Sequence, residues 1–382
     1  MNFLRDEEKG FNEMKKLRSE VEPRMKTLVK EVNINSLQKA VTRGIEIIAR
    51  TLLLLQLRKL NIHNNTDPGH GVGHWIRDLQ NALRFIPKLN DIDPKELFVG
   101  LVAGALHDIG CGVIPRYEEH RRVVRHAEAG ALLLLDLFNK KKLCLNEAEQ
   151  LLICYAIAAH THYLQEKEVN GRIIKPYKDT INGRPFYPVW IPRWIDRLDC
   201  NGPYFVIRHY LTLHDHHRDF CSEQQKFYEV DYFETMQPRL REKRTGKKTM
   251  LEHLKMFMDS QNNRSPYGKW DRGVYIELRE NYKRKLNRII QAVLHPEPID
   301  EKKTIVAWRA ALKKAEPING EKAAEKLENL FRSSLNKEAK LAWLSGFHTT
   351  ILEAAKLDEE IRRDIGMHLK EVQKIQKIFG IS

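Results

Sequence analysis

The chain contains 382 residues, of which 42% are hydrophobic, so it is long enough to bury a sizeable core in roughly two to three domains. Its 65 Lys and Arg residues exceed its 51 Asp and Glu residues and give a formal net charge of +14, which favours phosphate-bearing partners, although a merely basic surface would explain the same balance. The five cysteines are scattered without a Cys-x-x-Cys pair, and we identify neither a secretory signal nor a membrane-spanning run, so we expect a reduced, cytoplasmic protein.

The first two segments of the chain are predicted to be helical. Residues 1–35 have the pattern of a solvated amphipathic helix, with apolar residues at helical spacing at Met14, Leu17, Val21, Met25 and Leu28. Residues 37–60 have the pattern of a mostly apolar helix, and residues 61–69 form a turn-rich break after it. Residues 1–60 are therefore expected to form an N-terminal helical extension.

Two histidines precede the next amphipathic segment, which is predicted to be helical over residues 75–85. His70 and His74 are four residues apart, the spacing of neighbours on one helix face. An imidazole pair at this spacing can contribute to a metal site if further ligands lie nearby.

The helix that follows has a complete N-terminal signal. Asp93 is predicted to be its N-cap and Pro94 its first residue, with Glu96 three residues after the cap. Gly100 and Gly104 lie on one face of this helix, so a neighbouring helix can approach closely there.

His107 and Asp108 end this otherwise apolar segment. Burying an imidazole beside a carboxylate costs several kcal/mol unless both find partners, and a metal ion satisfies both. The alternative is an ordinary ion pair that meets water at a helix end stopped by Gly110. The presence of His74 upstream and of further carboxylates downstream favours the metal site.

Two later helices carry further candidate imidazoles. His126 lies in the predicted helix 118–135, shortly before that helix becomes fully apolar, although a surface histidine beside Arg125 is the alternative. His160 directly ends the apolar run of a helix that begins after a cap at Asn146, and His162 is an alternative to it.

Residues 166–188 break the helical pattern. Two Asn-Gly dipeptides flanked by β-branched and aromatic residues predict a small β insertion with hairpin turns. Its cations Arg172, Lys175 and Arg184 are candidate phosphate contacts, although a purely structural surface hairpin is an equal alternative.

Asp196 and Asp199 lie in the next predicted helix, three residues apart on either side of Arg197. The segment that follows contains the imidazole-rich stretch 214–217, for which an exposed loop is favoured over an independent metal site. Residues 296–382 are expected to form several helices, broken at Pro317 and near Gly346, whose role is packing or dimerisation.

Three motifs in this order resemble the HD-domain superfamily of metal-dependent phosphohydrolases: Asp67-Pro-Gly-His-(x)3-His74, Ala105-Leu-His-Asp-Ile-Gly110 and Ile195-Asp-Arg-Leu-Asp199. The resemblance covers roughly residues 66–290. It implies an all-α helical bundle over residues 61–295 with the β insertion 166–188 and a C-terminal helical extension over 296–382.

The resemblance also implies a ligand set, which consists of His74, His107, Asp108 and Asp196 for one metal and of His126 and His160 for a second, with Asp108 bridging. If only one ion is bound, His126 and His160 would instead be catalytic groups around that ion. Asp199 is either catalytic or a carboxylate that orients a ligand histidine, and Arg197 is a candidate phosphate contact. The mixed imidazole and carboxylate donors suit one or two divalent ions of manganese, iron, nickel, cobalt or zinc.

The activity implied is phosphoester hydrolysis by a metal-activated water, with a nucleotide or a related phosphorylated small molecule as substrate. No Gly-Tyr-Pro follows His160, and no Glu-Asp pair follows the His-Asp motif, which disfavours cyclic dinucleotide and guanosine tetraphosphate hydrolases. The alternatives are a di-iron oxygenase of HD type and a non-catalytic, metal-stabilised module that binds nucleic acid. No membrane partner is expected, and a homodimer is left open.

Overall fold

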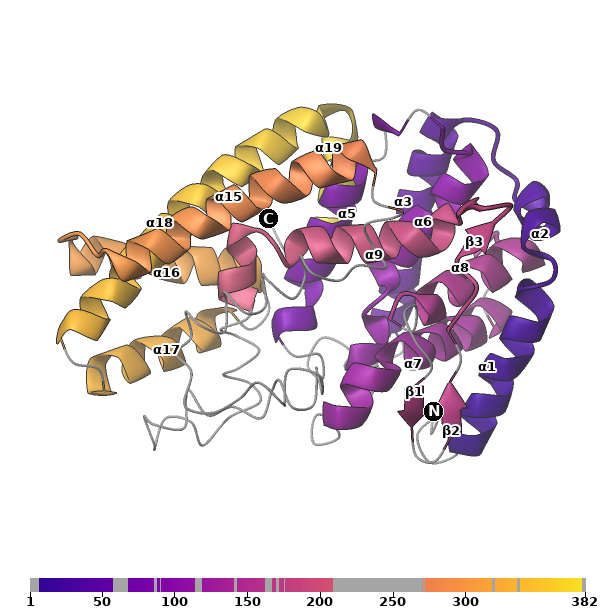
Figure 1. The fold of residues 1–382 in the computed structure, drawn as a ribbon, viewed down its shortest axis with the longest axis horizontal. Coiled ribbons are helices and arrows are strands. Elements are labelled where there is room, and N and C mark those ends of the chain that lie inside the picture. Colours follow the sequence, from indigo (N-terminus) through magenta and orange to yellow (C-terminus); the bar gives the residue numbers. More distant parts are fainter. Residues whose placement is uncertain are drawn as a thin grey trace. The chain divides into compact units, whose positions relative to one another are not determined.

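The computed structural model describes residues 7–57, 68–85, 88–89, 91–113, 119–140, 143–161, 167–169, 172–174, 176–208, 270, 272–317, 320–334 and 337–379. Within these residues, the regular structure is helical apart from two short hairpins, as Figure 1 shows. The predicted all-α fold with a small β insertion is therefore confirmed. Along these described stretches, no helix is both long and apolar enough to cross a membrane.

The chain divides into two compact units. The first comprises Met1–Thr66, Trp75–Asp196 and Ile365–Ser382, and the second comprises Asp67–His74 and Arg197–Asp364. The N-terminal helices and the last helix belong to the same unit as the His107-Asp108 motif. The predicted domain boundaries stay predictions.

The first unit is a bundle of helices, coloured indigo to rose in Figure 1 except for its last helix, α19, which is yellow. In chain order the unit contains α1 (Glu7–Val21), α2 (Met25–Glu31), α3 (Leu37–Leu57), the part of α5 (Val72–Phe85) from Trp75 on, α6 (Pro94–Leu106), the 3-10 turn η3 (Ile109–Gly112), α7 (Glu119–Lys140), α8 (Glu147–Ala159), α9 (Tyr187–Asp199) up to Asp196, η7 (Gly366–His368) and α19 (Leu369–Ile378).

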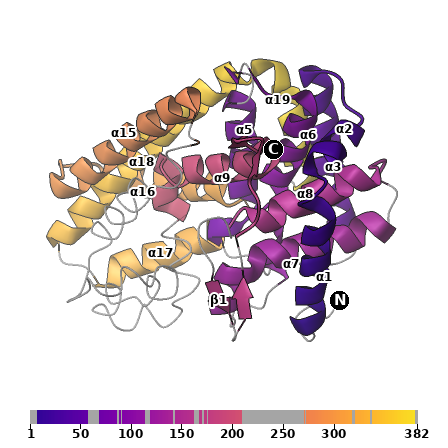
Figure 2. The same ribbon diagram turned by 45° about the vertical axis from the view of Figure 1, so that its right-hand side comes forward.

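Helix α8 lies at the centre of this bundle. It contacts α1, α2, α6 and α7, and Figure 2 shows α1 alongside α7 and α8. Its residues from Leu151 to Ala159 are all buried, which is the pattern of a helix surrounded by protein on every side.

The prediction of one continuous helix over residues 1–35 is wrong, whereas its apolar residues form a buried face, as the amphipathic pattern predicts. The chain forms two helices that are separated by a turn at residues 22–24. Their apolar residues are buried against α7 and α8, with Met14, Leu17, Val21, Met25 and Leu28 all at most 3% exposed.

The helix starts agree with the predicted caps, with one change. Asp93 caps α6 by accepting a hydrogen bond from the Lys95 amide at 2.8 Å. Glu96 does not close a capping box. It is 2% exposed and accepts two hydrogen bonds from the Arg184 guanidinium, at 2.6 and 2.9 Å. Asn146 caps α8 in a full capping box with Glu149.

Gly100 and Gly104 confirm the predicted close approach of a second helix. A Cβ atom at Gly100 would lie 2.6 Å from Ile191 Cδ1, and one at Gly104 would lie 2.5 Å from Ile195 Cδ1. Both isoleucines belong to α9, so two glycines on α6 admit the side chains of the helix that carries Asp196.

Gly110 permits an even closer contact between η3 and α7. A Cβ atom there would lie 1.9 Å from the backbone carbonyl oxygen of His126 and 2.6 Å from the Gly130 amide nitrogen. Backbone packs directly on backbone at this point, which places His126 next to the His107-Asp108 motif.

The β insertion consists of two separate hairpins. Strands β1 (Lys167–Val169) and β2 (Arg172–Ile174) pair antiparallel, as do β3 (Thr180–Ile181) and β4 (Arg184–Pro185). Asn182 and Gly183 both have positive φ, 50° and 75°, as the predicted Asn-Gly hairpin turn requires. The other predicted turn, at residues 170–171, lies outside the described residues.

The second unit contains η1 (Pro68–His70), α15 (Gly273–Leu294), α16 (Glu301–Ala315), α17 (Gly320–Ser334) and α18 (Lys337–Asp364). Its core includes Trp308 stacked on Phe347, with ring centroids 4.6 Å apart. The predicted histidine-rich loop at 214–217 lies outside the described residues.

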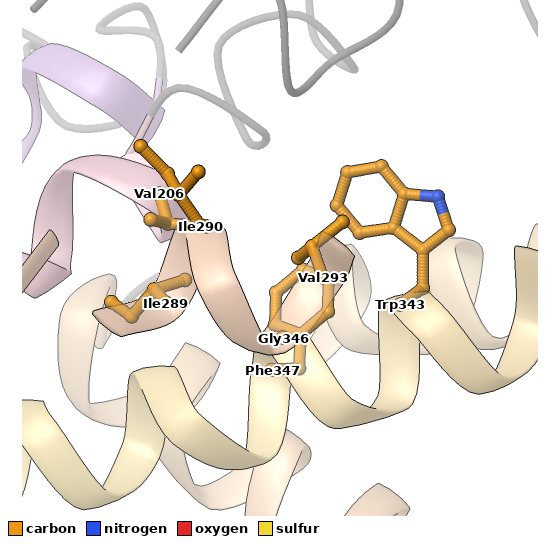
Figure 3. Close-up of a pocket in the computed structure, with 7 residues that line it drawn as sticks. All are labelled: Val206, Ile289, Ile290, Val293, Trp343, Gly346 and Phe347. Atoms are coloured by element: carbon orange, nitrogen blue, oxygen red, sulfur yellow. The ribbon is translucent and has the colours of Figure 1, made fainter. Parts of the chain in front are cut away.

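The predicted helix break near Gly346 is wrong, because α18 continues through this residue. A Cβ atom at Gly346 would lie 2.3 Å from Val293 Cγ2, so the glycine serves helix packing between α15 and α18. Figure 3 shows Gly346 and Val293 in the small apolar pocket that also includes Val206, Trp343 and Phe347.

Replacing Gly110 by alanine should destabilise the first unit. The new methyl group would overlap the His126 carbonyl, and relief requires moving backbone, so we expect a loss of at least about 1–3 kcal/mol in unfolding free energy. Thermal and urea denaturation measure it. Gly273→Ala is the control, because nothing lies within 4 Å of a Cβ there. Equal stability of both variants would contradict the close contact of η3 and α7.

Candidate metal centre

Three imidazoles converge on one buried carboxylate in the first unit. The Asp108 Oδ1 atom lies 3.4 Å from His107 Nε2, 3.1 Å from His126 Nε2 and 3.7 Å from His160 Nε2. The four residues are between 0 and 8% exposed. The alternative that the His107-Asp108 pair meets water at a helix end is therefore wrong.

Each of these side chains is placed by the end or the face of a helix. His107 is the C-cap of α6 and His160 is the C-cap of α8, while Asp108 begins η3. His126 lies on α7, which the glycine contact at Gly110 brings against η3. The prediction that His160 ends the apolar helix is confirmed, and His162 lies outside the described residues.

Backbone carbonyls fix the orientation of two of the rings. The His107 Nδ1 atom lies 2.7 Å from the Gly104 carbonyl oxygen, and His160 Nδ1 lies 2.7 Å from the Ile157 carbonyl oxygen. A carbonyl only accepts hydrogen bonds, so both Nδ1 atoms carry the proton and, in the neutral rings, both Nε2 atoms present a lone pair. This is the arrangement that holds histidine ligands in metal sites.

The converging atoms therefore fit a cation. His126 Nε2 and His160 Nε2 are 3.2 Å apart and both face the Asp108 carboxylate. Lone pairs and a carboxylate at such distances repel one another unless protons or a metal ion lie among them. Imidazole and carboxylate donors suit manganese, iron, nickel, cobalt or zinc.

A second group of donors adjoins the first, and it includes a residue that sequence reasoning missed. Ligand atoms of Asp78, His107 and Asp196 lie within 4.8 Å of one another. The Asp78 Oδ2 atom is 3.7 Å from His107 Nδ1, and Asp78 is fully buried on α5. The available signal was its position four residues after His74, on the same helix face.

Aromatic packing holds α5 and α9 together near these carboxylates. Phe85 of α5 and Trp194 of α9 make an edge-to-face contact with centroids 5.4 Å apart. Asp78 and Asp196 project from the same two helices.

His74 and Asp199, both in the second unit, form a hydrogen-bonded pair. The Asp199 Oδ2 atom accepts from His74 Nδ1 at 2.8 Å, and both residues are buried. This is the geometry expected for a carboxylate that orients a ligand histidine, which was one of the two roles predicted for Asp199. The metal-binding role of His74 stays a prediction.

The protonation equilibria around Asp108 indicate an excess of negative charge. Burial opposes the charged form of His107, but Asp108, Asp78 and Asp196 outweigh it and raise the pKa of His107 to about 10. Burial likewise opposes ionisation of Asp108, but His107, His126 and His160 hold its pKa well below the usual value. The same carboxylates would stabilise a bound divalent cation in place of the proton on His107.

His160 differs from His107 in its protonation. Burial is the largest influence and lowers the pKa of His160 to about 4, so the ring is neutral at pH 7. A neutral imidazole is the form that binds metals and accepts protons.

An arginine on α9 supports the end of the helix that carries His160. Arg193 is 2% exposed, and its Nη2 atom donates to the Ala159 carbonyl at 2.8 Å while Nη1 donates to Asp179 at 2.7 Å. A cation at a helix C-terminus satisfies a carbonyl that lacks an intrahelical partner. Arg193 therefore fixes the backbone directly before His160.

The predicted phosphate contacts are only partly described. Lys175 and the side chain of Arg172 lie outside the described residues. Arg184 is engaged with Glu96, and Arg197 is 5% exposed with its guanidinium 5.2 Å from the Tyr275 ring centroid. The phosphate-binding roles of all four stay predictions.

The neutral burial of His160 should make the metal-free protein sensitive to acid. The unfolded-state imidazole has a pKa near 6.5 and the folded one about 4, so between these pH values the unfolded chain binds the proton more strongly and stability falls as pH falls. We expect the chelator-treated wild type to lose about 3 kcal/mol more than His160→Gln across this window. Urea denaturation at pH 6.5 and 4 measures the difference, and parallel losses in both proteins would contradict a buried neutral His160.

Comparison with known proteins agrees with this geometry. Residues 71–181 match the HD domain family, a segment that contains His107, Asp108, His126 and His160. Neither a curated protein nor a solved structure matches the chain significantly. HD domains bind divalent metals and are typical of metal-dependent phosphohydrolases. Residues 71–181 are thus similar to the HD domain family.

Proposed function

We propose that the protein is a metal-dependent hydrolase of phosphoesters. The observation that carries the proposal is the convergence of three imidazole Nε2 atoms on Asp108 Oδ1, at 3.1–3.7 Å, inside a protein core. Such a set is expensive to bury without a cation, and a divalent ion provides the missing positive charge.

Two overlapping donor groups support more than one ion. His107, Asp108 and His160 form one group, and His126 Nε2 lies 3.1 Å from Asp108 Oδ1 beside it. His107 also belongs to a group with Asp78 and Asp196. The metal-binding role of His74, which precedes Asp78 by one helical turn on α5, stays a proposal from the sequence.

A divalent ion held by these residues would supply a Lewis acid, which would polarise a phosphoryl oxygen and make a water molecule a stronger nucleophile at neutral pH. The protein's own contribution is geometry and proton transfer. Hydrogen bonds to backbone carbonyls hold the rings of His107 and His160, and burial excludes competing water. If only one ion is bound, the neutral His160 is available as a proton acceptor and His126 as its partner.

A nucleotide or a related phosphorylated small molecule is the proposed substrate. The net charge of +14 favours anionic partners, and the insertion 166–188 lies in the chain between His160 and the helix that carries Asp196. Arg172 and Lys175 are the proposed phosphate contacts of the insertion, while Arg184 would have to leave its pair with Glu96. We also propose a cytoplasmic location. A homodimer and nucleic acid binding are further proposals, which rest on the sequence alone.

A di-iron oxygenase is the second candidate, favoured by the same two overlapping groups of imidazole and carboxylate donors. Oxygen consumption by the iron-loaded protein would distinguish it from a hydrolase. A non-catalytic nucleic-acid-binding module would instead bind nucleic acid in a salt-dependent manner without turnover.

Replacing Asp108 by asparagine should abolish both metal binding and turnover while the protein stays folded. The amide lacks the charge on which all three imidazoles converge, so we expect phosphate release from nucleotides to fall more than about 100-fold, together with the metal-to-protein ratio. A phosphate-release screen with added manganese, iron or cobalt and elemental analysis provide the measurements.

Glu147→Gln is the matched control, because it makes the same carboxylate-to-amide change at an exposed position in the first turn of α8. It should keep both metal and activity. Full metal occupancy in Asp108→Asn would remove Asp108 from the ligand set, and an absence of phosphate release from every substrate by the metal-loaded wild type would contradict the proposed hydrolase.

A further inference from the structure

Cys111 is the one thiol among the described residues that lies within a group of potential metal ligands. Its Sγ atom and ligand atoms of Asp108 and His126 all lie within 4.8 Å of one another. Cys111 is 2% exposed, so its sulfur faces the protein interior.

The local backbone explains why Cys111 and Asp108 face the same way. The Cys111 amide donates to the Asp108 carbonyl at 2.9 Å, which is the hydrogen bond of a 3-10 turn. Side chains at positions i and i+3 eclipse each other in such a turn. The 3-10 turn from Asp108 to Cys111 therefore places the Cys111 sulfur beside the Asp108 carboxylate.

The contact with α7 brings the third member of the group. Gly110 of η3 packs against the backbone carbonyl of His126 on α7. Cys111 follows Gly110 in the chain, so this contact brings Cys111 close to His126. A larger residue at Gly110 would separate η3 from α7. Two different chain segments thus present sulfur, nitrogen and oxygen donors together.

We infer that Cys111 is a metal ligand of this centre and supplies a thiolate to the ion held by Asp108 and His126. This assignment rests on the proposed metal centre. On binding, the thiol S–H bond breaks and a sulfur–metal bond forms, while the proton leaves to solvent and no electrons are transferred. A thiolate ligand is soft, so the site prefers zinc, iron or cobalt to manganese or magnesium.

The test is the absorption spectrum of the full-length protein loaded with cobalt(II) alone. Thiolate ligation gives a sulfur-to-cobalt charge-transfer band in the near ultraviolet, which oxygen and nitrogen ligands do not give. We expect the band in the wild type and in Cys144→Ser, whose cysteine is exposed and outside the donor groups. Cys111→Ser should bind cobalt without the band and should lose about tenfold or more in affinity for zinc relative to manganese.

The outcomes separate the ligand assignment from the metal centre itself. Cobalt bound by the wild type without the band, or a band retained in Cys111→Ser, would overturn the role of Cys111 and leave the centre intact. A wild type that retains no cobalt would overturn the centre and the assignment with it. If Cys111→Ser does not fold, the presence of the band in the wild type and its absence in Cys111→Ala decide whether Cys111 binds the ion.

Discussion

The buried carboxylate of Asp108 is the charge around which this site is organised. A carboxylate in a protein core requires positive charge or hydrogen-bond donors, and the three imidazole Nε2 atoms within 3.7 Å of its Oδ1 atom provide them only when protonated or when a metal ion is present. Backbone carbonyls already bind the Nδ1 protons of His107 and His160, which directs their Nε2 atoms toward the carboxylate. The raised pKa of His107 and the lowered pKa of His160 both follow from this balance of burial and charge.

The surrounding helices keep these groups in position at their ends. His107 and His160 are C-caps, so their side chains project beyond the ends of α6 and α8, and α8 is covered by other helices. Glycines at positions 104 and 110 remove the side chains that would separate α6 from α9 and η3 from α7. Arg193 then fixes the carbonyl before His160. Stability and site geometry therefore depend on the same contacts, so substitutions far from the imidazoles can alter metal binding.

Much of this arrangement could be predicted from the sequence, because its signals are local. A polar pair in an apolar run, an Asn-Gly turn and a capping residue each act over a few residues. The structure confirms the burial of His107, the hairpin turn at Asn182 and the helix cap at Asn146. Contacts between distant segments were not predictable in this way. Asp78 and Cys111 join the donor groups through packing of α5 and η3, and Gly346 marked a helix contact where a break was predicted. The compact units likewise depend on long-range packing of the terminal helices.

We expect a cation among the three imidazoles and Asp108. Anomalous X-ray diffraction from crystals of the purified protein, collected on both sides of the absorption edge of its bound metal, locates such an ion. An anomalous peak should lie within bonding distance of Asp108 and of the Nε2 atoms of His126 and His160. Crystals grown with manganese, zinc and cobalt that place these side chains together as here, yet show no peak between them, would contradict it.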